Sequence, residues 1–214
     1  MRAYDSDMSL LPDVGVRDPD AFADALRTHG ACRLRGFPGA AASAALRADL
    51  LRLREDVPFQ PASVGRGAGL GRHAAVRGDA TLWLDDARTG AAAADYLAAL
   101  DAMCAALNRR LFQGLDHVEA HYAAYPVGAR YTRHRDRFRD DDARVVSIVT
   151  YLNPDWGHDD GGALRLVLDA GEVDVAPTSG SVCFLSELEH EVLPSTHARY
   201  SIAAWLRRRP ASKG

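Results

Sequence analysis

Between residues 144 and 176 the chain reads RVVSIVTYLNPDWGHDDGGALRLVLDAGEVDVA. Three short apolar segments alternate here with clusters of proline, glycine and aspartate, which is the pattern of strands joined by tight turns. This pattern of short apolar segments separated by turn residues begins after Gly114. It predicts eight strands, over residues 117–125, 130–136, 144–152, 163–168, 172–176, 181–185, 190–193 and 198–206. Because no long helix separates them, these strands favour a β-sandwich or jelly roll.

The first half of the chain has a different pattern. Apolar residues recur every three or four positions in three segments, which predicts helices over residues 18–27, 41–55 and 92–112. A strand is expected over 31–37 and a loop over 60–72. The predicted fold class is therefore α+β, a jelly roll with helices packed on one sheet. We expect one integrated domain, in which residues 1–114 support a β core at 115–214.

The composition is that of an ordinary globular protein, with 47% hydrophobic and 26% charged residues. A net charge of −3 does not indicate the basic surface that binds nucleic acid or an anionic membrane. No apolar run in the sequence is long enough to span a bilayer. The start, MRAYDSDMSLL, lacks the layout of a signal peptide. Cys32, Cys104 and Cys183 lie far apart in apolar patterns, which predicts free thiols. We therefore expect a cytoplasmic protein that binds neither nucleic acid nor membrane.

A candidate metal site lies in the segment RYTRHRD (130–136), where His134 and Asp136 are two residues apart. In a strand, side chains at this spacing point to the same face. Two histidines and one carboxylate on one side of an octahedron leave three positions open, as in non-haem Fe(II) oxygenases. The third ligand would have to come from a neighbouring strand, and His190 begins one.

Other residues share this spacing. His158 and Asp160 form a second pair, but they fall in a turn rich in aspartate and glycine, where strand alternation does not apply. His117 and Glu119 form a related pair at the start of a strand. The segment RHRDRFRDDDAR (133–144) is also typical of a solvated charge cluster. The spacing alone leaves these alternatives open.

The last predicted strand, ARYSIAAWLR (198–207), places Arg199 on the same face as Ser201, Ala203 and Trp205. An arginine among small residues on the inner face of a sandwich is costly to bury without an anion. A planar guanidinium is well matched to a carboxylate, which it can bind through two hydrogen bonds. An arginine at an exposed strand edge is the competing interpretation.

Five blocks of the sequence resemble a known family when taken together. They are VRGDATLW (76–83), AYPVGARYTRHRD (124–136), YLNPDW (151–156), GGALRL (161–166) and HEVLPSTHARYSIAAW (190–205). Jointly they resemble the 2-oxoglutarate oxygenase superfamily, and within it the hypoxia-sensing prolyl hydroxylases and their bacterial relatives. The resemblance implies a double-stranded β-helix with iron at one end.

The resemblance also implies roles for individual residues. Fe(II) would be held by His134, Asp136 and His190, with 2-oxoglutarate and O2 as cosubstrates. Arg199 would pair with the distal carboxylate of 2-oxoglutarate, and Tyr151 would hydrogen-bond to the same carboxylate. An arginine at this position, rather than the lysine of collagen-type hydroxylases, favours the oxygen-sensing branch.

Further residues of the matched blocks would surround the cosubstrate. Tyr125 would line its pocket and Trp205 would form the floor. Strand alternation predicts that Tyr131 points away from His134. Ala203 departs from the human sensor enzymes, which carry a hydroxyl residue there, and this bears on oxygen kinetics rather than on the chemistry.

In the resembled family the block containing Arg77, Asp79 and Trp83 follows a loop that closes over the peptide substrate. The glycine-rich segment 60–72 fits such a loop, and the three residues are expected to bind substrate. Core packing is the alternative for Trp83.

Three classes of function are consistent with these features. The first is a prolyl (4-)hydroxylase of a protein, in which no residue beyond the metal ligands is catalytic and ascorbate serves as reductant. Bacterial relatives act on elongation factor Tu, so a translation factor is the expected partner. The second is an oxygenase of a free amino acid or small metabolite. The third is a non-catalytic protein that binds iron and senses oxygen.

Overall fold

A computed structural model describes residues 11–56, 59–62, 76–137, 142–178 and 180–209. Its helices are α2 (Pro19–His29), α3 (Ala40–Asp56), α4 (Ala91–Leu111) and the short 3-10 helix η3 (His158–Asp160). Its strands are β1 (Asp13–Gly15), β2 (Ala31–Arg35), β3 (Gln60–Pro61), β4 (Ala80–Trp83), β5 (Leu115–Tyr125), β6 (Tyr131–His134), β7 (Arg144–Tyr151), β8 (Leu164–Leu168), β9 (Gly171–Val175), β10 (Gly180–Leu185), β11 (His190–Val192) and β12 (Arg199–Arg208).

Local sequence explains where the helices begin and end. Helix α2 begins after Asp18, whose carboxylate accepts a hydrogen bond from the Ala21 amide at 3.0 Å. It ends at Gly30, which takes the left-handed conformation with φ of 72°. Helix α4 is capped from another element, because the Gly90 amide donates to the buried Asp49 carboxylate of α3 at 3.1 Å. This contact fixes α3 against the start of α4.

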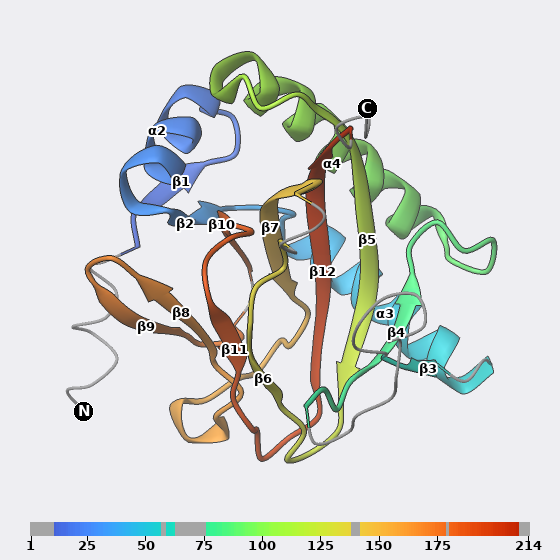
Figure 1. Ribbon diagram of the computed structural model, residues 1–214. Helices are drawn as coiled ribbons and strands as arrows, with labels where there is room; N and C mark the ends of the chain where they lie inside the picture. The colour runs from blue at the N-terminus through green and yellow to red at the C-terminus, as the bar shows by residue number, and fades with distance from the viewer. Residues whose placement is uncertain (1–10, 57–58, 63–75, 138–141, 179, 210–214) are drawn as a thin grey trace.

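The strands form two sheets (Figure 1). The larger sheet has the order β1-β2-β10-β7-β12-β5-β4-β3, and the smaller has the order β6-β11-β8-β9. Only the β1–β2 pair is parallel among the strand pairs of the described residues. The last strand of the described chain, β12, lies in the larger sheet between β5 and β7.

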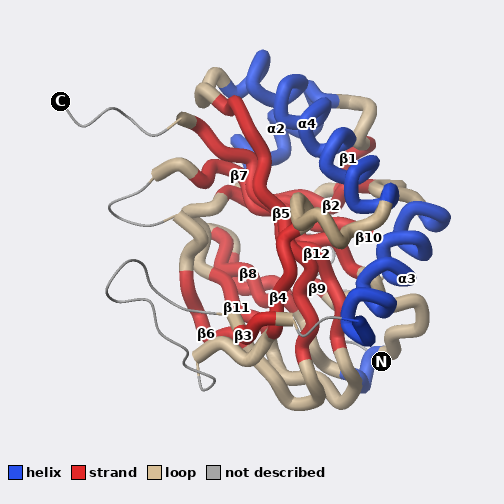
Figure 2. Tube along the Cα trace, turned by 90° about the vertical axis from the view of Figure 1, so that its right-hand side faces the viewer, coloured by secondary structure: helices blue, strands red, loops and turns tan. Residues whose placement is uncertain are grey.

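Two hydrophobic cores lie on opposite faces of the larger sheet. On β5, Tyr122 packs in the core shared with Leu50 and Leu100 of the helices, whereas Ala123 packs in a core shared with Leu166 of the smaller sheet. The helices therefore cover only the outer face of the larger sheet, as Figure 2 shows, and the space between the two sheets remains for a site.

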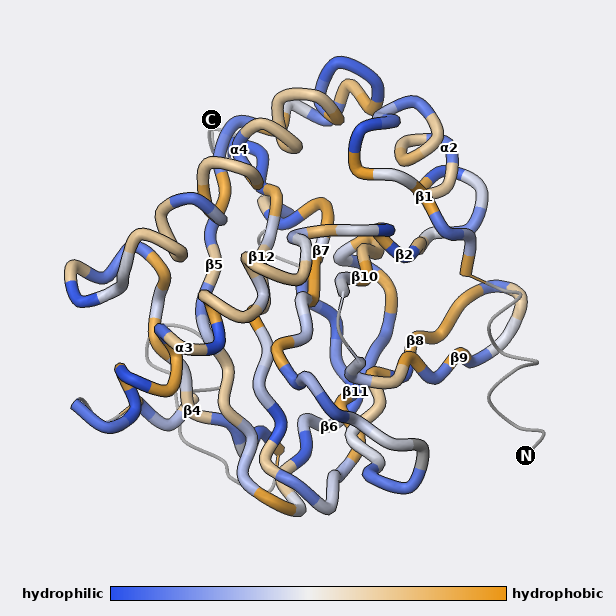
Figure 3. Tube along the Cα trace, turned by 180° about the vertical axis from the view of Figure 1, so that it is seen from behind, coloured by the Kyte–Doolittle hydropathy of each residue, from blue (hydrophilic) through white to orange (hydrophobic). Residues whose placement is uncertain are grey.

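The secondary structure agrees with the predictions at each of the eight expected strands of the second half, within two residues at either end. The three expected helices are also present, and they pack on one sheet as predicted. Strands β1, β3 and β4 were not expected, and of the predicted 60–72 loop, residues 63–72 lie outside the described residues. Figure 3 shows hydrophobic residues concentrated in central strands such as β7 and β8 and hydrophilic ones at the outer end of α3.

All three cysteines are buried and free, as expected. Burial raises the pKa of the Cys32 thiol to about 12, so this side chain stays protonated at neutral pH. Among the described residues, no helix combines the length and the hydrophobic character that crossing a bilayer requires.

Candidate active site

A cavity of about 710 Å³ lies between the two sheets. Strands β5, β7 and β12 supply one wall, and β6 and β11 supply part of the other. The wall residues of β12 are those that strand alternation placed on one face: Arg199, Ser201, Ala203 and Trp205. Ala203 is the Cα partner of His121, so its small side chain lies beside an imidazole in this wall.

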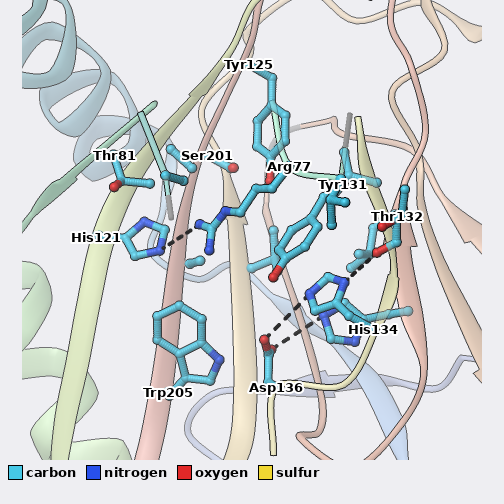
Figure 4. A pocket seen from close by; sticks show the side chains of 18 of the residues that line it. Arg77, Thr81, His121, Tyr125, Tyr131, Thr132, His134, Asp136, Ser201 and Trp205 are labelled. Atoms are coloured by element: carbon cyan, nitrogen blue, oxygen red, sulfur yellow. Dashed lines mark hydrogen bonds and ion pairs between the residues drawn. The ribbon is translucent and has the colours of Figure 1, made fainter. Parts of the chain in front are cut away.

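The predicted metal ligands meet at one end of this cavity (Figure 4). His134 ends β6, Asp136 follows it, and His190 begins β11, where it is the Cα partner of His134. The Nε2 atom of His134 lies 3.8 Å from Asp136 Oδ1, and that of His190 lies 3.5 Å from Asp136 Oδ2. All three ligand atoms lie within 4.8 Å of one another, and they are the one such group among the described residues.

Both imidazoles present the right nitrogen to a metal. Nδ1 of His134 lies 2.8 Å from the Thr132 carbonyl, and Nδ1 of His190 lies 3.0 Å from the Leu188 carbonyl. A carbonyl only accepts, so each Nδ1 carries the proton and donates. Each Nε2 therefore keeps a lone pair, and these lone pairs converge on the Asp136 carboxylate. This donor set fits a divalent transition metal such as Fe(II).

The protonation states also suit a metal. Burial, reinforced by His190, lowers the pKa of His134 to about 3, so this imidazole is neutral at neutral pH. Burial alone would raise the pKa of Asp136, but its interactions with His190, His134 and Arg144 outweigh burial and hold that pKa well below the usual value. A neutral imidazole and an ionised carboxylate are the forms that bind a cation.

Two serines that were not predicted from the sequence form a hydrogen-bonded chain that ends on Asp136. The hydroxyl of Ser147 lies 2.7 Å from Asp136 Oδ2 and 2.9 Å from the hydroxyl of Ser186. A signal for Ser147 exists in the sequence, because it alternates with Val149 and Tyr151 on one face of the predicted strand.

Arg199 lies in the same cavity with only 1% of its surface exposed. Its Nε donates to the Gly162 carbonyl at 3.1 Å, and its Nη1 donates to the Ser201 hydroxyl at 3.0 Å. Its Nη2 has no hydrogen-bond partner in the described part of the chain, and no carboxylate there forms an ion pair with it. A buried cation with an unfilled donor is costly unless an anion binds it.

Of the aromatic residues expected around the cosubstrate, Tyr125 and Trp205 line the cavity, whereas Tyr151 lies beside Arg199 and lines a second, smaller pocket. The Arg199 guanidinium lies 5.0 Å from the Tyr125 ring and 5.4 Å from the Tyr151 ring, and both tyrosines are buried. Burial is the main cause that raises the pKa of Tyr125 above its usual value, so it remains a neutral phenol. Trp205 lines the cavity, and the Arg144 guanidinium covers its indole ring at 3.7 Å.

Arg77, which is partly buried, and Asp79, which is fully buried, form a bidentate ion pair at the cavity. Arg77 donates from Nε and Nη2 to the two carboxylate oxygens at 2.7 and 3.0 Å. The Nη2 atom of Arg77 also lies 3.5 Å from Nε2 of His121. In Figure 4, His121 and Tyr131 lie on opposite sides of the Arg77 guanidinium. Burial, together with Arg77, lowers the pKa of His121 to about 4, so His121 is a neutral acceptor. His121 was missed, although it shares a strand face with Tyr125.

The prediction that Tyr131 points away from His134 is wrong. The two rings stack at 3.5 Å, with 17° between their planes. Tyr131 pairs with Val192 and His134 pairs with His190, so β6 contains one more residue than β11 between these pairs. This bulge reverses the alternation and brings Tyr131 to the face of the metal ligands.

The remaining predicted residues are placed as follows. Trp83 is 45% exposed and meets the His121 ring edge-on at 5.2 Å, so it is a cavity residue and not part of the core. The competing His117 is exposed and contacts Asp116 at 2.7 Å. Asp160 accepts from the Gly157 amide within its own turn at 2.7 Å.

Comparison with known proteins relates this site to one superfamily. The family model described as 2OG-Fe(II) oxygenase superfamily matches residues 120–207. Egl nine homolog 1 from Homo sapiens is 28% identical over 140 residues, which are 61% of this chain and 33% of that protein. The chain thus aligns with about a third of the length of this relative.

Two solved structures are similar over most of the chain. A prolyl-4-hydroxylase of Pseudomonas putida has a TM-score of 0.80 and 43% identity, covering 89% of this chain and 99% of that one. A Trichoplax adhaerens prolyl hydroxylase, solved with a hypoxia inducible factor oxygen degradation domain peptide fragment, has a TM-score of 0.79 and 28% identity, covering 90% of each chain.

Proposed function

Because the chain belongs to the 2OG-Fe(II) oxygenase superfamily, we propose that it hydroxylates a prolyl residue of a protein at the site between its two sheets. The observation that carries this proposal is the convergence of His134, Asp136 and His190 in a cavity that also holds the unsatisfied guanidinium of Arg199. A metal site and an anion site in one cavity are what a metal-bound oxo acid requires.

His134, Asp136 and His190 would hold Fe(II). When bound, Fe(II) supplies the activation of O2, of which one atom enters the product hydroxyl and the other enters succinate as 2-oxoglutarate loses CO2. The chain contributes ligands in the correct protonation state and a position between two sheets that limits the access of water.

Arg199 would bind the distal carboxylate of 2-oxoglutarate through its unsatisfied Nη2. Tyr151 would add a hydrogen bond to this carboxylate, while Tyr125 and Trp205 would enclose the rest of the cosubstrate. Ascorbate would act as an external reductant, as the family resemblance implies.

The two sheets support assignment to a double-stranded β-helix. From β5 to β12 the chain alternates between larger and smaller sheet, with β8 and β9 together in the smaller one. Four strands on each side, β10-β7-β12-β5 and β6-β11-β8-β9, would make up the two sheets of such a fold. Residues 1–114 would support this core at 115–214 within one domain, because β2 and β4 extend the same larger sheet.

A protein substrate is supported by the cavity and by the relatives. The cavity reaches Arg77 and the exposed Trp83, beyond the region around Arg199 that 2-oxoglutarate would fill. The Pseudomonas putida protein is a prolyl-4-hydroxylase, and the Trichoplax adhaerens enzyme was solved in complex with a peptide fragment. A translation factor such as elongation factor Tu, in the cytoplasm, is our proposed partner. Turnover of a free amino acid is the alternative.

The test incubates the protein with Fe(II), 2-oxoglutarate and a lysate of its own organism, and maps one-oxygen mass increases on peptides by mass spectrometry. A single modified proline, absent without O2, is expected. Modification of free metabolites without any protein would contradict the protein substrate. Absence of succinate formation under every condition would contradict the enzyme and favour a binding protein.

Arg77→Ala and Asp79→Ala are expected to weaken hydroxylation of the protein substrate. They should affect less the decarboxylation of 2-oxoglutarate that occurs when no protein substrate is present. Each change breaks a partly buried pair at the cavity, so KM for the protein substrate should rise by roughly tenfold or more, about 1.4 kcal/mol. Arg130→Ala is a matched control, because this arginine is exposed on the turn that hydrogen-bonds to Gly78. Equal KM values in all four proteins would show that the pair does not bind substrate.

A further inference from the structure

Two buried hydroxyl groups form a chain behind the Asp136 carboxylate. Ser147 lies on β7 and Ser186 directly follows β10, and their exposed fractions are 1% and 0%. The Ser147 hydroxyl contacts Asp136 Oδ2 at 2.7 Å, and the Ser186 hydroxyl contacts that of Ser147 at 2.9 Å. Both serines are attached to the larger sheet, whereas Asp136 follows a strand of the smaller one.

The direction of these hydrogen bonds follows from the number of protons. An ionised carboxylate only accepts, so the single hydroxyl proton of Ser147 is donated to Asp136. Ser147 can then only accept from Ser186, which must donate. Donors arranged in series strengthen one another, and a hydrogen bond to a charged acceptor is among the stronger kinds.

Ser186 also holds the segment that carries Asp136. Its carbonyl accepts from the amide of Arg137, the residue after Asp136, at 2.9 Å. Its own amide donates to the Val145 carbonyl of β7 at 3.0 Å. The backbone and the side chain of Ser186 therefore both connect Asp136 to the larger sheet.

We propose that Ser147 is a positioning residue for Asp136 as a metal ligand, and that Ser186 holds Ser147 in its donating orientation. This inference rests on the proposed function. With Oδ2 engaged by Ser147, the carboxylate is held in one rotamer and favours binding a metal through Oδ1 alone. Coordination through one oxygen keeps the further positions open for cosubstrate and O2.

The same strand offers a matched control on its opposite face. The Thr150 hydroxyl of β7 is also fully buried, and it contacts the hydroxyl groups of Tyr96 at 2.7 Å and Ser181 at 2.6 Å. Thr150→Val removes a buried hydroxyl of the same strand without touching Asp136. It should lower the melting temperature but leave metal affinity unchanged.

The experiment titrates the purified, metal-free protein with Co(II), used as a spectroscopic substitute for Fe(II), and records its visible absorption. Ser147→Ala should raise the dissociation constant by about 10- to 100-fold and alter the absorption bands. Ser186→Ala should have a smaller effect of the same sign, and Ser147→Thr, which keeps the donor, should restore binding to near the parent value.

Parent-like affinity and absorption bands in Ser147→Ala would overturn the inference. So would an equal loss of affinity in Thr150→Val, because the effect would then be one of general stability. The proposed function is tested separately by the parent protein. If the parent bound no Co(II), the metal site itself would be wrong, and the role of Ser147 would be overturned with it.

Discussion

Asp136→Ala is expected to abolish hydroxylation and succinate formation while the protein remains folded. The change removes the only carboxylate of the ligand group and leaves two neutral imidazoles, which cannot balance the charge of a divalent cation. The loss of Co(II) or Fe(II) affinity should exceed the roughly 100-fold upper range for residues that only orient a ligand. Calorimetric metal titration and a succinate assay measure both effects.

Asp160→Ala is the informative control for this experiment. Asp160 belongs to the competing histidine–aspartate pair of the sequence, and in the structure it binds the Gly157 amide of its own turn. Its loss should leave metal affinity at the parent value. Full activity in Asp136→Ala, or loss of the metal in Asp160→Ala, would refute the assignment of the metal site.

Arg199→Ala is expected to raise KM for 2-oxoglutarate by roughly thirtyfold or more, which corresponds to about 2 kcal/mol for a buried charge partner. Gly162 and Ser201 orient the guanidinium so that Nη2 remains available, and this geometry is lost with the side chain. Arg199→Lys keeps the charge but not the planar fork, so its KM should lie between those of the parent and of Arg199→Ala.

A cosubstrate analogue without the distal carboxylate, 2-oxopentanoate, separates this effect from general damage. The parent should discriminate strongly between 2-oxoglutarate and the analogue, and Arg199→Ala should lose most of that discrimination. If the variant folds and still prefers 2-oxoglutarate as strongly as the parent does, the distal carboxylate is bound by another group.

Strands with one face in the core and the other toward the cavity were predicted well from the sequence. Burial of one face places hydrophobic residues at every second position, which is a clear pattern. Arg199 and Trp205 lie on the expected cavity face for this reason. Strand β4 was missed because it has only four residues, and its conformation depends on pairing with β5, where Ala80 is the partner of Ala124.

Two features of the site could not be read from local patterns. The bulge in β6 depends on how β11 pairs with it, so the stacking of Tyr131 on His134 contradicts simple alternation. The chain from Ser186 to Asp136 joins residues 39 and 11 positions apart along the sequence, and it exists only once the two sheets face each other.

The central position of β12 constrains how this protein can be synthesised and folded. This strand is made after both of its neighbours, yet β5 and β7 are each hydrogen-bonded to it. A nascent chain that has not yet released residues 199–208 from the ribosome has two strands without their common partner and no Arg199. Completion of the larger sheet must therefore wait until β12 has emerged, and the unpaired edges of β5 and β7 would need protection from aggregation during that interval.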